Sequence, residues 1–562
     1  MSKREIIKKG IDYLKYYGVK ELARKTEERL IPEIHPYSDW YPSHLMSQGK
    51  KSQSPGELSS NPLVSIIVPT YETPRDQFLS MVESVKKQIY TNFQLCIADG
   101  SISGDVEECV SALLSDPRIC YKRLDNNLGI AGNTNAAVSM AGGEYLAFLD
   151  HDDILEPDAL YEMVLAATKD PEAGMIYSDE DKCSSDGRDY FCPHFKSGYN
   201  IDLLRSCNYI CHFLMVKREL YDVVGGFDGS FDGAQDYDFV LKCTEHTDHV
   251  VHVPKILYHW RCSDNSTAGN ATGKMYAFEA GRRALAAHLS RLGIDASVHH
   301  GQDLGYYRVQ YDLMHEPRVS VIITTDGDNK SLVRCVKALR KSRYENYDFY
   351  IIKDNSRDIN SCVKNDADGD FIIILNEELI VSEKDDWMRE LLSQCDRDEI
   401  GIVGTKLTAP SGRLFNRHFP MKSVYHAGMI LGMSGIVGNA FKGLPANLTG
   451  YMHRASLLAD CSAVSPLMYI IRKETFIRYG GLDESIAPGL AGPDLCLRIL
   501  QDGKRILYDP FVTATYYGKG AKINPDDMRL MRSRWAEMMS CGDKYYNPNF
   551  SLEPPGYVLR TD

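Results

Sequence analysis

Hydrophobic residues follow two alternating spacings along the chain from Pro62 onward. Val64–Val68 is a β-rich apolar run that ends at Pro69, and the apolar residues after it recur at the spacing of one helical face: Phe78, Met81, Val82, Val85 and Ile89. Phe93–Ala98 is a second strand-like run, and a helical pattern toward Leu114 follows it. Strands that alternate with helices predict a parallel, doubly wound α/β sheet that binds ligands at its carboxyl edge.

The same pattern occurs twice. Three segments, VSIIVPT (64–70), IADGS (97–101) and GGFD (225–228), recur as VSVIITT (319–325), IKDNS (352–356) and GGLD (480–483), each displaced by the same number of residues. GGEYLAFLDHDDIL also resembles DGDFIIILNEELIV, but the two segments are separated by fewer residues than the other three pairs. The second copy therefore has fewer residues before this strand and a similar number of additional residues after it. We therefore expect two α/β domains of common ancestry, with a boundary near Asp303–Pro317.

The beginning of the chain differs in charge from the rest. Residues 1–30 carry nine Lys or Arg against five Asp or Glu, and their apolar residues approach helical spacing: Ile7, Ile11, Leu14, Val19 and Leu22. Two interpretations are open, a solvated helix docked on the body or an interfacial helix attracted to anionic lipid. Ser47–Asn61 is polar, so residues 1–61 are predicted to be a basic helical segment and a linker.

Composition narrows the class of protein. The 562 residues are 43% hydrophobic and 25% charged, which excludes wholesale disorder, collagen-like repeats and coiled coils. The net charge of −13 offers no broad basic face, so we expect no nucleic acid partner. The 15 cysteines are scattered without a Cys-x-x-Cys pair and indicate free thiols in a reducing compartment. Neither a signal peptide nor a membrane-spanning run occurs, so the sequence predicts a cytoplasmic protein.

One acidic cluster stands where chemistry is expected. The predicted strand Tyr145–Leu149 runs into Asp150-His151-Asp152-Asp153, and a divalent cation bridging a diphosphate would relieve that concentration of negative charge. An Asp-x-Asp pair alone is often a solvated turn. Here it closes an ordered series of polar motifs: Asn126-Asn127-Leu128-Gly129, Asn133-Thr134-Asn135 and Gly142-Gly143-Glu144.

These motifs carry a family resemblance. Val64–Trp260 resembles the catalytic domain of a family-2 glycosyltransferase of the GT-A fold, through VSIIVPTYE, a strand ending in Asp99, NNLGIAGNTNAAVSMAGGEYLAFLDHDD and GGFDGSFDGAQDYDF. YSDEDK (177–182), HVPKILYHWR (252–261), HAGMILGMSG, KGLP and YYNPNFSL are similar to a bacterial subgroup linked to rhamnan and O-antigen assembly, which is also tandem. The resemblance implies two tandem GT-A (nucleotide-diphospho-sugar transferase, Rossmann-like) domains: a catalytic domain at 62–310 and a degenerate one at 317–562 with a C-terminal tail.

The resemblance also implies roles for individual residues. Asp99 is expected to bind the pyrimidine base of the donor, and the base and ribose are expected to be lined by Pro69, Thr70, Tyr71 and Glu72. Asp150 and Asp152 resemble the family's Asp-x-Asp pair, which binds Mg²⁺ or Mn²⁺. Asp152 is expected to be the main metal ligand, and Asp150 is expected to lie nearer the ribose. Asp236 matches the general base that deprotonates the acceptor hydroxyl. The family's acidic residue before that base is Gln235 here.

Three further groups keep two interpretations each. His259, Trp260 and Arg261 are candidate contacts to metal, sugar and phosphate, or the end of a strand packed on the core. The acids of Tyr177–Lys182 either grip an acceptor sugar or form a solvated turn. Asn133 and Asn135 either bind the donor or begin a helix.

The second copy departs where chemistry would occur. Asn376-Glu377-Glu378-Leu379 replaces the acidic cluster, and Gly492 replaces Asp236 when Asp238 is aligned with Asp494. Asp354 survives as the counterpart of Asp99. We therefore predict a second domain without turnover, with a structural or acceptor-holding role.

Together these features predict a metal-dependent inverting glycosyltransferase. It would move a sugar, with rhamnose as the first guess, from a nucleotide-diphosphate donor to a growing cell-surface polysaccharide or lipid-linked glycan. Peripheral contact with the inner face of the cell membrane and with other glycan-assembly enzymes is part of this prediction. The alternatives are a non-catalytic glycan-binding or scaffold protein and a bifunctional transferase with both domains active. Dehydrogenase and P-loop functions are disfavoured because the required glycine-rich loops are missing.

Overall fold

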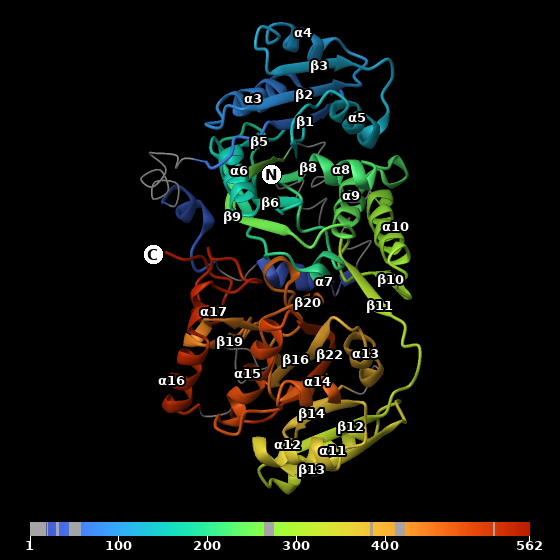
Figure 1. Ribbon diagram of the computed structural model, residues 1–562, viewed down its shortest axis with the longest axis vertical. Coiled ribbons are helices and arrows are strands. Elements are labelled where there is room, and N and C mark those ends of the chain that lie inside the picture. Colours follow the sequence, from blue (N-terminus) through green and yellow to red (C-terminus); the bar gives the residue numbers. More distant parts are fainter. Residues whose placement is uncertain are drawn as a thin grey trace.

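The chain folds into two α/β domains that lie end to end along the long axis of the molecule (Figure 1). The computed structural model describes residues 18–19, 21–29, 33–43, 58–262, 275–382, 386–410, 422–520 and 523–561. Each domain is built on one nine-stranded sheet. Between them in the chain stands a hairpin of β10 (Ala296–His300) and β11 (Tyr307–Tyr311). The predicted α/β class with two tandem domains is confirmed.

The first sheet has the strand order β3-β2-β1-β4-β8-β6-β9-β5, with β7 paired to β6. Its strands are β1 (Val64–Thr70), β2 (Phe93–Asp99), β3 (Ile119–Arg123), β4 (Tyr145–Phe148), β5 (Ile154–Leu155), β6 (Met175–Cys183), β7 (Tyr190–His194), β8 (Leu214–Lys217) and β9 (Val250–Arg261). The first four strands pair in parallel, as predicted, whereas β8 and β5 run antiparallel to their neighbours. The continuous apolar runs did not reveal this reversal because they report burial on both faces, not strand direction.

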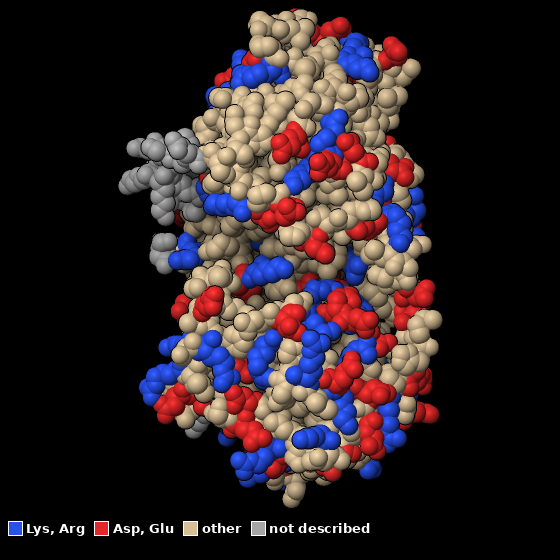
Figure 2. Space-filling model, in the orientation of Figure 1, with Lys and Arg blue, Asp and Glu red and all other residues tan. Residues whose placement is uncertain are grey.

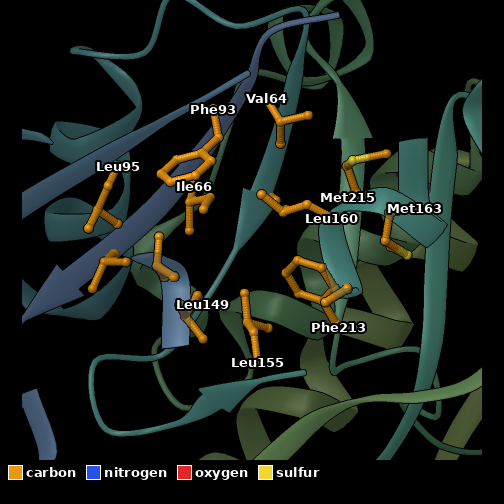
Figure 3. Close-up of a cluster of buried hydrophobic side chains, with 14 of the residues drawn as sticks. Val64, Ile66, Phe93, Leu95, Leu149, Leu155, Leu160, Met163, Phe213 and Met215 are labelled. Carbon is orange, nitrogen blue, oxygen red and sulfur yellow. The ribbon is translucent and has the colours of Figure 1, made fainter. Parts of the chain in front are cut away.

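Helices cover both faces of this sheet. They are α3 (Arg75–Lys86), α4 (Asp105–Ser111), α5 (Gly129–Val138), α6 (Ala159–Lys169), α7 (Ile201–Leu204), α8 (Arg218–Val224), α9 (Gln235–Thr244) and α10 (Met275–Arg291). Two hydrophobic clusters contain successive residues of β1. Ile66 packs with Phe93 and Leu160 in one cluster (Figure 3), and Ile67 belongs to the second cluster. A strand buried on both faces needs apolar residues at every position, which explains the uninterrupted run.

The second sheet has the order β13-β12-β14-β21-β16-β22-β15, with β17 paired to β16 and β20 to β22. Its strands are β12 (Val319–Thr325), β13 (Tyr347–Lys353), β14 (Phe371–Asn376), β15 (Leu379–Val381), β16 (Ile400–Pro410), β17 (Lys422–His426), β20 (Ala459–Asp460), β21 (Met468–Arg472) and β22 (Arg505–Tyr516), and β18 (Met429–Leu431) pairs with β19 (Val437–Asn439) apart from it. The helices are α11 (Asn329–Leu339), α12 (Ser356–Asn365), α13 (Trp387–Cys395), α14 (Lys473–Arg478), α15 (Pro488–Gln501), α16 (Pro525–Arg534) and α17 (Ala536–Ser540).

The two sheets correspond strand by strand except at one edge. The orders β2-β1-β4-β8-β6-β9-β5 and β13-β12-β14-β21-β16-β22-β15 match, and β3 has no counterpart. The stretch that the second copy lacks is therefore α4 with β3. The stretch it regains lies between β17, which pairs with β16 as β7 pairs with β6, and β21; it contains β18 to β20.

Buried ion pairs and aromatic side chains join the domains. Asp202 on α7 is fully buried and accepts hydrogen bonds from Arg397 at 2.8 Å and from Arg505, both in the second domain. Residues 37–43 are helical and pack against both domains, with Tyr37 and Tyr41 among the buried side chains. Arg24, in the helical stretch 21–29, pairs with Asp303 at 2.6 Å. Residues 21–43 thus dock on the body where they are described, whereas Ile7, Ile11, Leu14 and most of the predicted linker lie outside the described residues.

Charged side chains are unevenly spread over the visible face. In Figure 2, blue and red side chains are interspersed over the second domain, and the upper part of the first domain is mostly uncharged. Within the described ranges, no helix combines the length and apolar character that crossing a membrane requires.

Candidate active site

The acidic turn after β4 is anchored by one of its own carboxylates. Asp153 is fully buried, and its two oxygens accept hydrogen bonds from the Tyr258 hydroxyl and, at 2.7 Å, from the backbone N–H of Arg261. β9 therefore fixes the turn. Asp150, by contrast, keeps 43% of its side chain exposed at the carboxyl edge of the sheet.

This turn concentrates negative charge. Burial raises the pKa of Asp152, and the neighbouring Asp150 charge raises it further. Burial together with Asp152 and Asp150 raises the pKa of Asp153 well above its ordinary value. Carboxylate oxygens are the ligands that Mg²⁺ and Mn²⁺ prefer, so Asp150 and Asp152 fit a divalent cation. No cluster of three or more His, Cys, Asp or Glu side chains in the described ranges has metal-site geometry.

Asp236 lies in the first turn of α9, close to the acidic turn. Its Oδ2 accepts a hydrogen bond of 3.0 Å from the Asn208 amide. Burial raises the pKa of Asp236, the Asp150 charge adds to this shift, and the His212 charge opposes it. A carboxylate with a raised pKa is a stronger base, which suits proton abstraction.

His212, which the sequence analysis did not select, stands at the centre of these acids. Its Nε2 lies 3.6 Å from Asp150 Oδ2, its Nδ1 lies 3.3 Å from Glu180 Oε2, and its ring stacks on Tyr258 at 4.9 Å. Burial opposes a charge on His212, but the Glu180 hydrogen bond and the surrounding carboxylates outweigh it and raise the pKa to about 9. His212 occurs in no motif; the available signal was the acidic run YSDEDK, in which Glu180 requires a cationic partner once the strand is buried.

The YSDEDK segment is a buried strand and not a solvated turn. Asp179, Glu180 and Asp181 lie on β6 and are almost fully buried. Asp179 is bonded to His252 at 2.7 Å and to the Asn547 amide at 2.8 Å. The turn interpretation is therefore wrong, and these internal bonds leave no free acid for an acceptor sugar.

His259 does not fit the predicted role of metal ligand. Its Nδ1 lies 2.6 Å from Asp181 Oδ1, and its Nε2 lies 2.9 Å from Glu156 Oε1. Burial opposes its charge, but Asp181 and Glu156 raise its pKa to about 9. A protonated imidazole whose two N–H groups donate to carboxylates has no lone pair for a metal.

Arg261 and Trp260 have separate positions at the end of β9. Arg261 is 3% exposed and donates to the Asp152 carbonyl at 2.6 Å, the Ser185 carbonyl at 2.8 Å and Ser80 Oγ at 2.9 Å. It therefore holds the acidic turn, and the predicted phosphate contact does not fit this geometry. Trp260 lies with its ring 5.9 Å from that of His212, on the same side as the acids.

The predicted donor residues meet at the carboxyl ends of β1 and β2. Asp99 is fully buried and accepts hydrogen bonds from Thr70 Oγ1 at 3.1 Å, the Ser101 N–H at 2.9 Å and the Tyr121 hydroxyl at 2.9 Å. Pro69 is buried beside it, Tyr71 is 44% exposed, and Glu72 Oε1 accepts from the Ile102 N–H at 2.6 Å. These residues lie together, and their role in base and ribose binding stays a prediction.

Asn133 and Asn135 are engaged in internal hydrogen bonds. Asn133 Oδ1 accepts from the Leu128 N–H at 3.0 Å. Asn135 donates to the Phe227 carbonyl at 2.8 Å and accepts from the Phe227 N–H at 3.0 Å. Asn360 makes the same pair of bonds to Leu482 in the second domain. Because the second domain repeats the arrangement without the acidic cluster, the geometry favours a structural role for Asn135.

Among the described residues of the second domain, the positions of Asp150 and Asp236 are occupied by Asn376 and Gly492. Glu377 is turned inward, with its oxygens accepting from the Thr325 hydroxyl at 2.6 Å and the Asp326 N–H at 2.8 Å. At Gly492 a Cβ would lie 3.0 Å from the Cβ of Pro466, so no carboxylate can be placed there without movement. Burial raises the pKa of Asp354 to about 6, with Asp326 and Glu377 adding to the shift.

Comparison with known proteins agrees with this site. Residues 65–225 match the family model described as glycosyl transferase family 2. WcaA of Escherichia coli, named for colanic acid biosynthesis as a glycosyl transferase, is 30% identical over 33% of this chain and 67% of its own length. The chain belongs to glycosyl transferase family 2.

Two longer relatives match along nearly the whole chain. The O-antigen biosynthesis protein RfbC of Myxococcus xanthus is 28% identical over 96% of this chain, and an uncharacterized protein, y4gI, of Sinorhizobium fredii is 31% identical over 92%. The chain spans 44% of RfbC and 61% of y4gI, so both relatives contain additional sequence.

Proposed function

We propose that the first domain is a metal-dependent inverting glycosyltransferase that moves a sugar from a nucleotide-diphosphate donor to a growing cell-surface glycan. The observation that carries this proposal is the convergence of Asp150 and Asp236 around His212, with Asp152 beside Asp150 in the acidic turn. Family membership and the name of RfbC support transfer in polysaccharide assembly. A rhamnosyl donor is the first to test because of the resemblance to the rhamnan subgroup.

Each side chain has a defined task in this proposal. Asp150 and Asp152 hold Mg²⁺ or Mn²⁺, which when bound offsets the charge that develops on the leaving diphosphate. Arg261 and Asp153 keep the acidic turn in place through the contacts described above. Asp236 accepts the proton of the acceptor hydroxyl as that oxygen attacks the anomeric carbon from the face opposite the leaving group, and Asn208 orients the carboxylate.

His212 adds a positive charge between the donor and acceptor sides of the site. Its imidazolium lies against Asp150 and is held by Glu180, and Lys196 supports that acid at 4.0 Å. A fixed cation at this place stabilises negative charge without reorganisation during the reaction.

Incubation of the protein with a panel of nucleotide sugars, a divalent metal and a lipid-linked acceptor tests the proposal. We expect one donor to give a product with inverted anomeric configuration, and Asp236→Asn to prevent its formation. Glycan binding without transfer for every donor would instead support the non-catalytic scaffold function.

A contact with the inner face of the membrane is a separate proposal, and it rests on the excess of basic residues in 1–30. Residues 21–43 dock on the body, so any lipid contact would come from residues before them. Vesicles containing anionic lipid should retain the full chain more strongly than neutral vesicles. Equal retention by both kinds of vesicle would contradict the proposal.

A further inference from the structure

The second domain and the hairpin before it line a cavity. Its volume is about 830 Å³, within the range of small-molecule sites. One wall is the face of β16 and β22, and the opposite wall includes Tyr306 and Tyr307 from the hairpin that follows the first domain. The cavity thus lies where the two domains meet, a common place for ligand sites.

Lys406 is the unusual group in this cavity. Its side chain is 6% exposed, and its Nζ has one hydrogen bond, to the Ala446 carbonyl at 3.4 Å. No described carboxylate lies within ion-pair distance of it, and burial lowers its pKa to about 8. A buried ammonium without an anion is costly, and a bound anion would remove that cost.

Hydroxyl groups and a second lysine extend this polar surface. Lys406 is opposite Thr513 in the β16–β22 pairing, and Thr408 is opposite Thr515. Lys422 donates to Thr515 Oγ1 at 2.8 Å, and the hydroxyls of Thr408 and Thr515 lie 3.3 Å apart. All of these side chains line the cavity. The acid in the cavity lining, Asp303 of the hairpin turn, is paired with Arg24 at 2.6 Å, so its charge is offset.

In the first domain, the corresponding face of β6 and β9 is covered by other side chains and has different polar groups. The strand pairing aligns Asp179 with Lys406, Asp181 with Thr408 and His259 with Thr515. There the acids are satisfied by covering side chains, Tyr37 at 2.6 Å from Asp181 and Asn547 at 2.8 Å from Asp179. In the second domain, Lys406 takes the place of Asp179. The cavity takes the place of the side chains that cover the acids in the first domain.

We propose that this cavity binds a polyhydroxylated ligand carrying one anionic group, either a sugar phosphate or an acidic sugar. Lys406 and Lys422 hold the anion, and Thr408, Thr513 and Thr515 meet hydroxyl groups. The aromatic walls supply apolar contact, with Tyr517 and Phe511 on the same side as the threonines. The site is distinct from the transfer site, because its residues belong to the second domain and the hairpin.

Calorimetric titration of the full chain with glucose 1-phosphate, glucuronate and neutral glucose tests the proposal. Each titration is repeated in Asp152→Ala protein, which removes binding at the transfer site. We expect an anionic probe to bind in both proteins. A response to glucose 1-phosphate alone assigns a phosphorylated ligand, and one to glucuronate alone assigns an acidic sugar. Equal binding of neutral glucose, or binding of no probe, overturns the proposal.

Variants locate the site. Lys406→Met should weaken the anionic probe at least 10-fold, Lys406→Arg should retain it, and Lys364→Met, on the exposed side of α12, should have no effect. Unchanged affinity in Lys406→Met overturns the assignment. A second readout needs no variant: acetylation of Lys406 in the native protein, followed by mass spectrometry, should slow when the probe is present. Unchanged acetylation at saturating probe also overturns it.

Discussion

The two domains share a strand order and differ in their chemistry, which separates what the fold requires from what catalysis requires. Both retain the Asn that ties a helix to the Gly-Gly turn, Asn135 and Asn360. Both also retain a buried helical acid paired with a cation one turn later: Asp238 with Lys242 at 2.7 Å and Asp494 with Arg498 at 2.8 Å. Only the first domain has Asp150, Asp152 and Asp236. Features present in both copies are therefore structural, and features present only in the first are candidates for catalysis.

Buried histidines give a second contrast. His212 and His259 in the first domain lie between carboxylates, and their pKa values are raised to about 9. His426 in the second domain is buried against neutral groups, with Nδ1 at 2.8 Å from Asn439 Oδ1, and burial lowers its pKa to about 4. His212 and His259 are therefore buried as charged groups, and His426 is buried as a neutral one.

The largest effect is expected from the acidic turn. Asp150→Ala combined with Asp152→Ala should reduce transfer roughly 10³-fold or more, because the charge that forms on the leaving diphosphate would lose its counter-ion. Glu377→Gln with Glu378→Gln is the matched change in the second domain and should leave the chemical step intact. Product mass and linkage analysis checks both.

One result would contradict the assignment of catalysis to the first domain alone. A second linkage that disappears only with the Glu377 and Glu378 changes would show that both domains are active. Asp494 is unsuitable for the control set, because it is buried between Arg498, Arg534 and Trp535 and its loss would destabilise the domain.

The next effect concerns the base. Asp236→Asn should lower kcat by roughly 10²–10⁴-fold, because the amide cannot accept the acceptor proton, while donor affinity changes little. Asp222→Asn, on the exposed side of α8, is the control. Steady-state kinetics with donor titration measures both quantities, and wild-type turnover in Asp236→Asn would remove this residue from the mechanism.

The sequence predicted most of this fold because periodic apolar runs and an internal repeat report buried strands directly. It selected Asp150 and Asp152 through motif order and Asp236 through a family resemblance, and their roles stay predictions. It did not identify His212 or exclude His259, because the environment of a histidine depends on strands that are distant in sequence. Asp181 and Glu156 reach His259 from β6 and from the segment after β5. The burial of YSDEDK was missed for the same reason, since its acids are satisfied by partners as remote as Asn547.

A smaller effect is expected at His212. His212→Gln keeps a hydrogen-bonding group beside Glu180 but removes the charge beside Asp150, and a hydrogen bond to a charged group contributes about 1.5–3 kcal/mol. We expect kcat/KM to fall roughly 10- to 100-fold. His299→Gln, an exposed change on β10, is the control, and equal activity of the two variants would show that His212 serves only packing.

The smallest expected effect is the pH dependence of the unfolding free energy at two buried histidines, His426 and His259. At His426 the folded pKa is below the unfolded value of about 6.5, so the unfolded state binds more protons and acid favours unfolding. From pH 7 to pH 5 this group should cost roughly 2 kcal/mol of unfolding free energy. At His259 the folded pKa of about 9 lies above the unfolded value, so its contribution is present below pH 6.5 and is lost as pH rises through 9.

The contributions of His426 and His259 should therefore appear on different limbs of the stability curve. Urea unfolding at pH 5, 7 and 9.5 measures them. His426→Gln should be less stable than the wild type at pH 7 but should lose less on going to pH 5, with an unchanged alkaline limb. His259→Gln should flatten the alkaline limb alone, by roughly 2 kcal/mol between pH 7 and 9.5. If His426→Gln lost as much stability in acid as the wild type, the acid limb would come from other groups, such as His453, whose pKa burial lowers to about 4, or Asp202, whose pKa the interdomain arginines hold below its ordinary value despite burial.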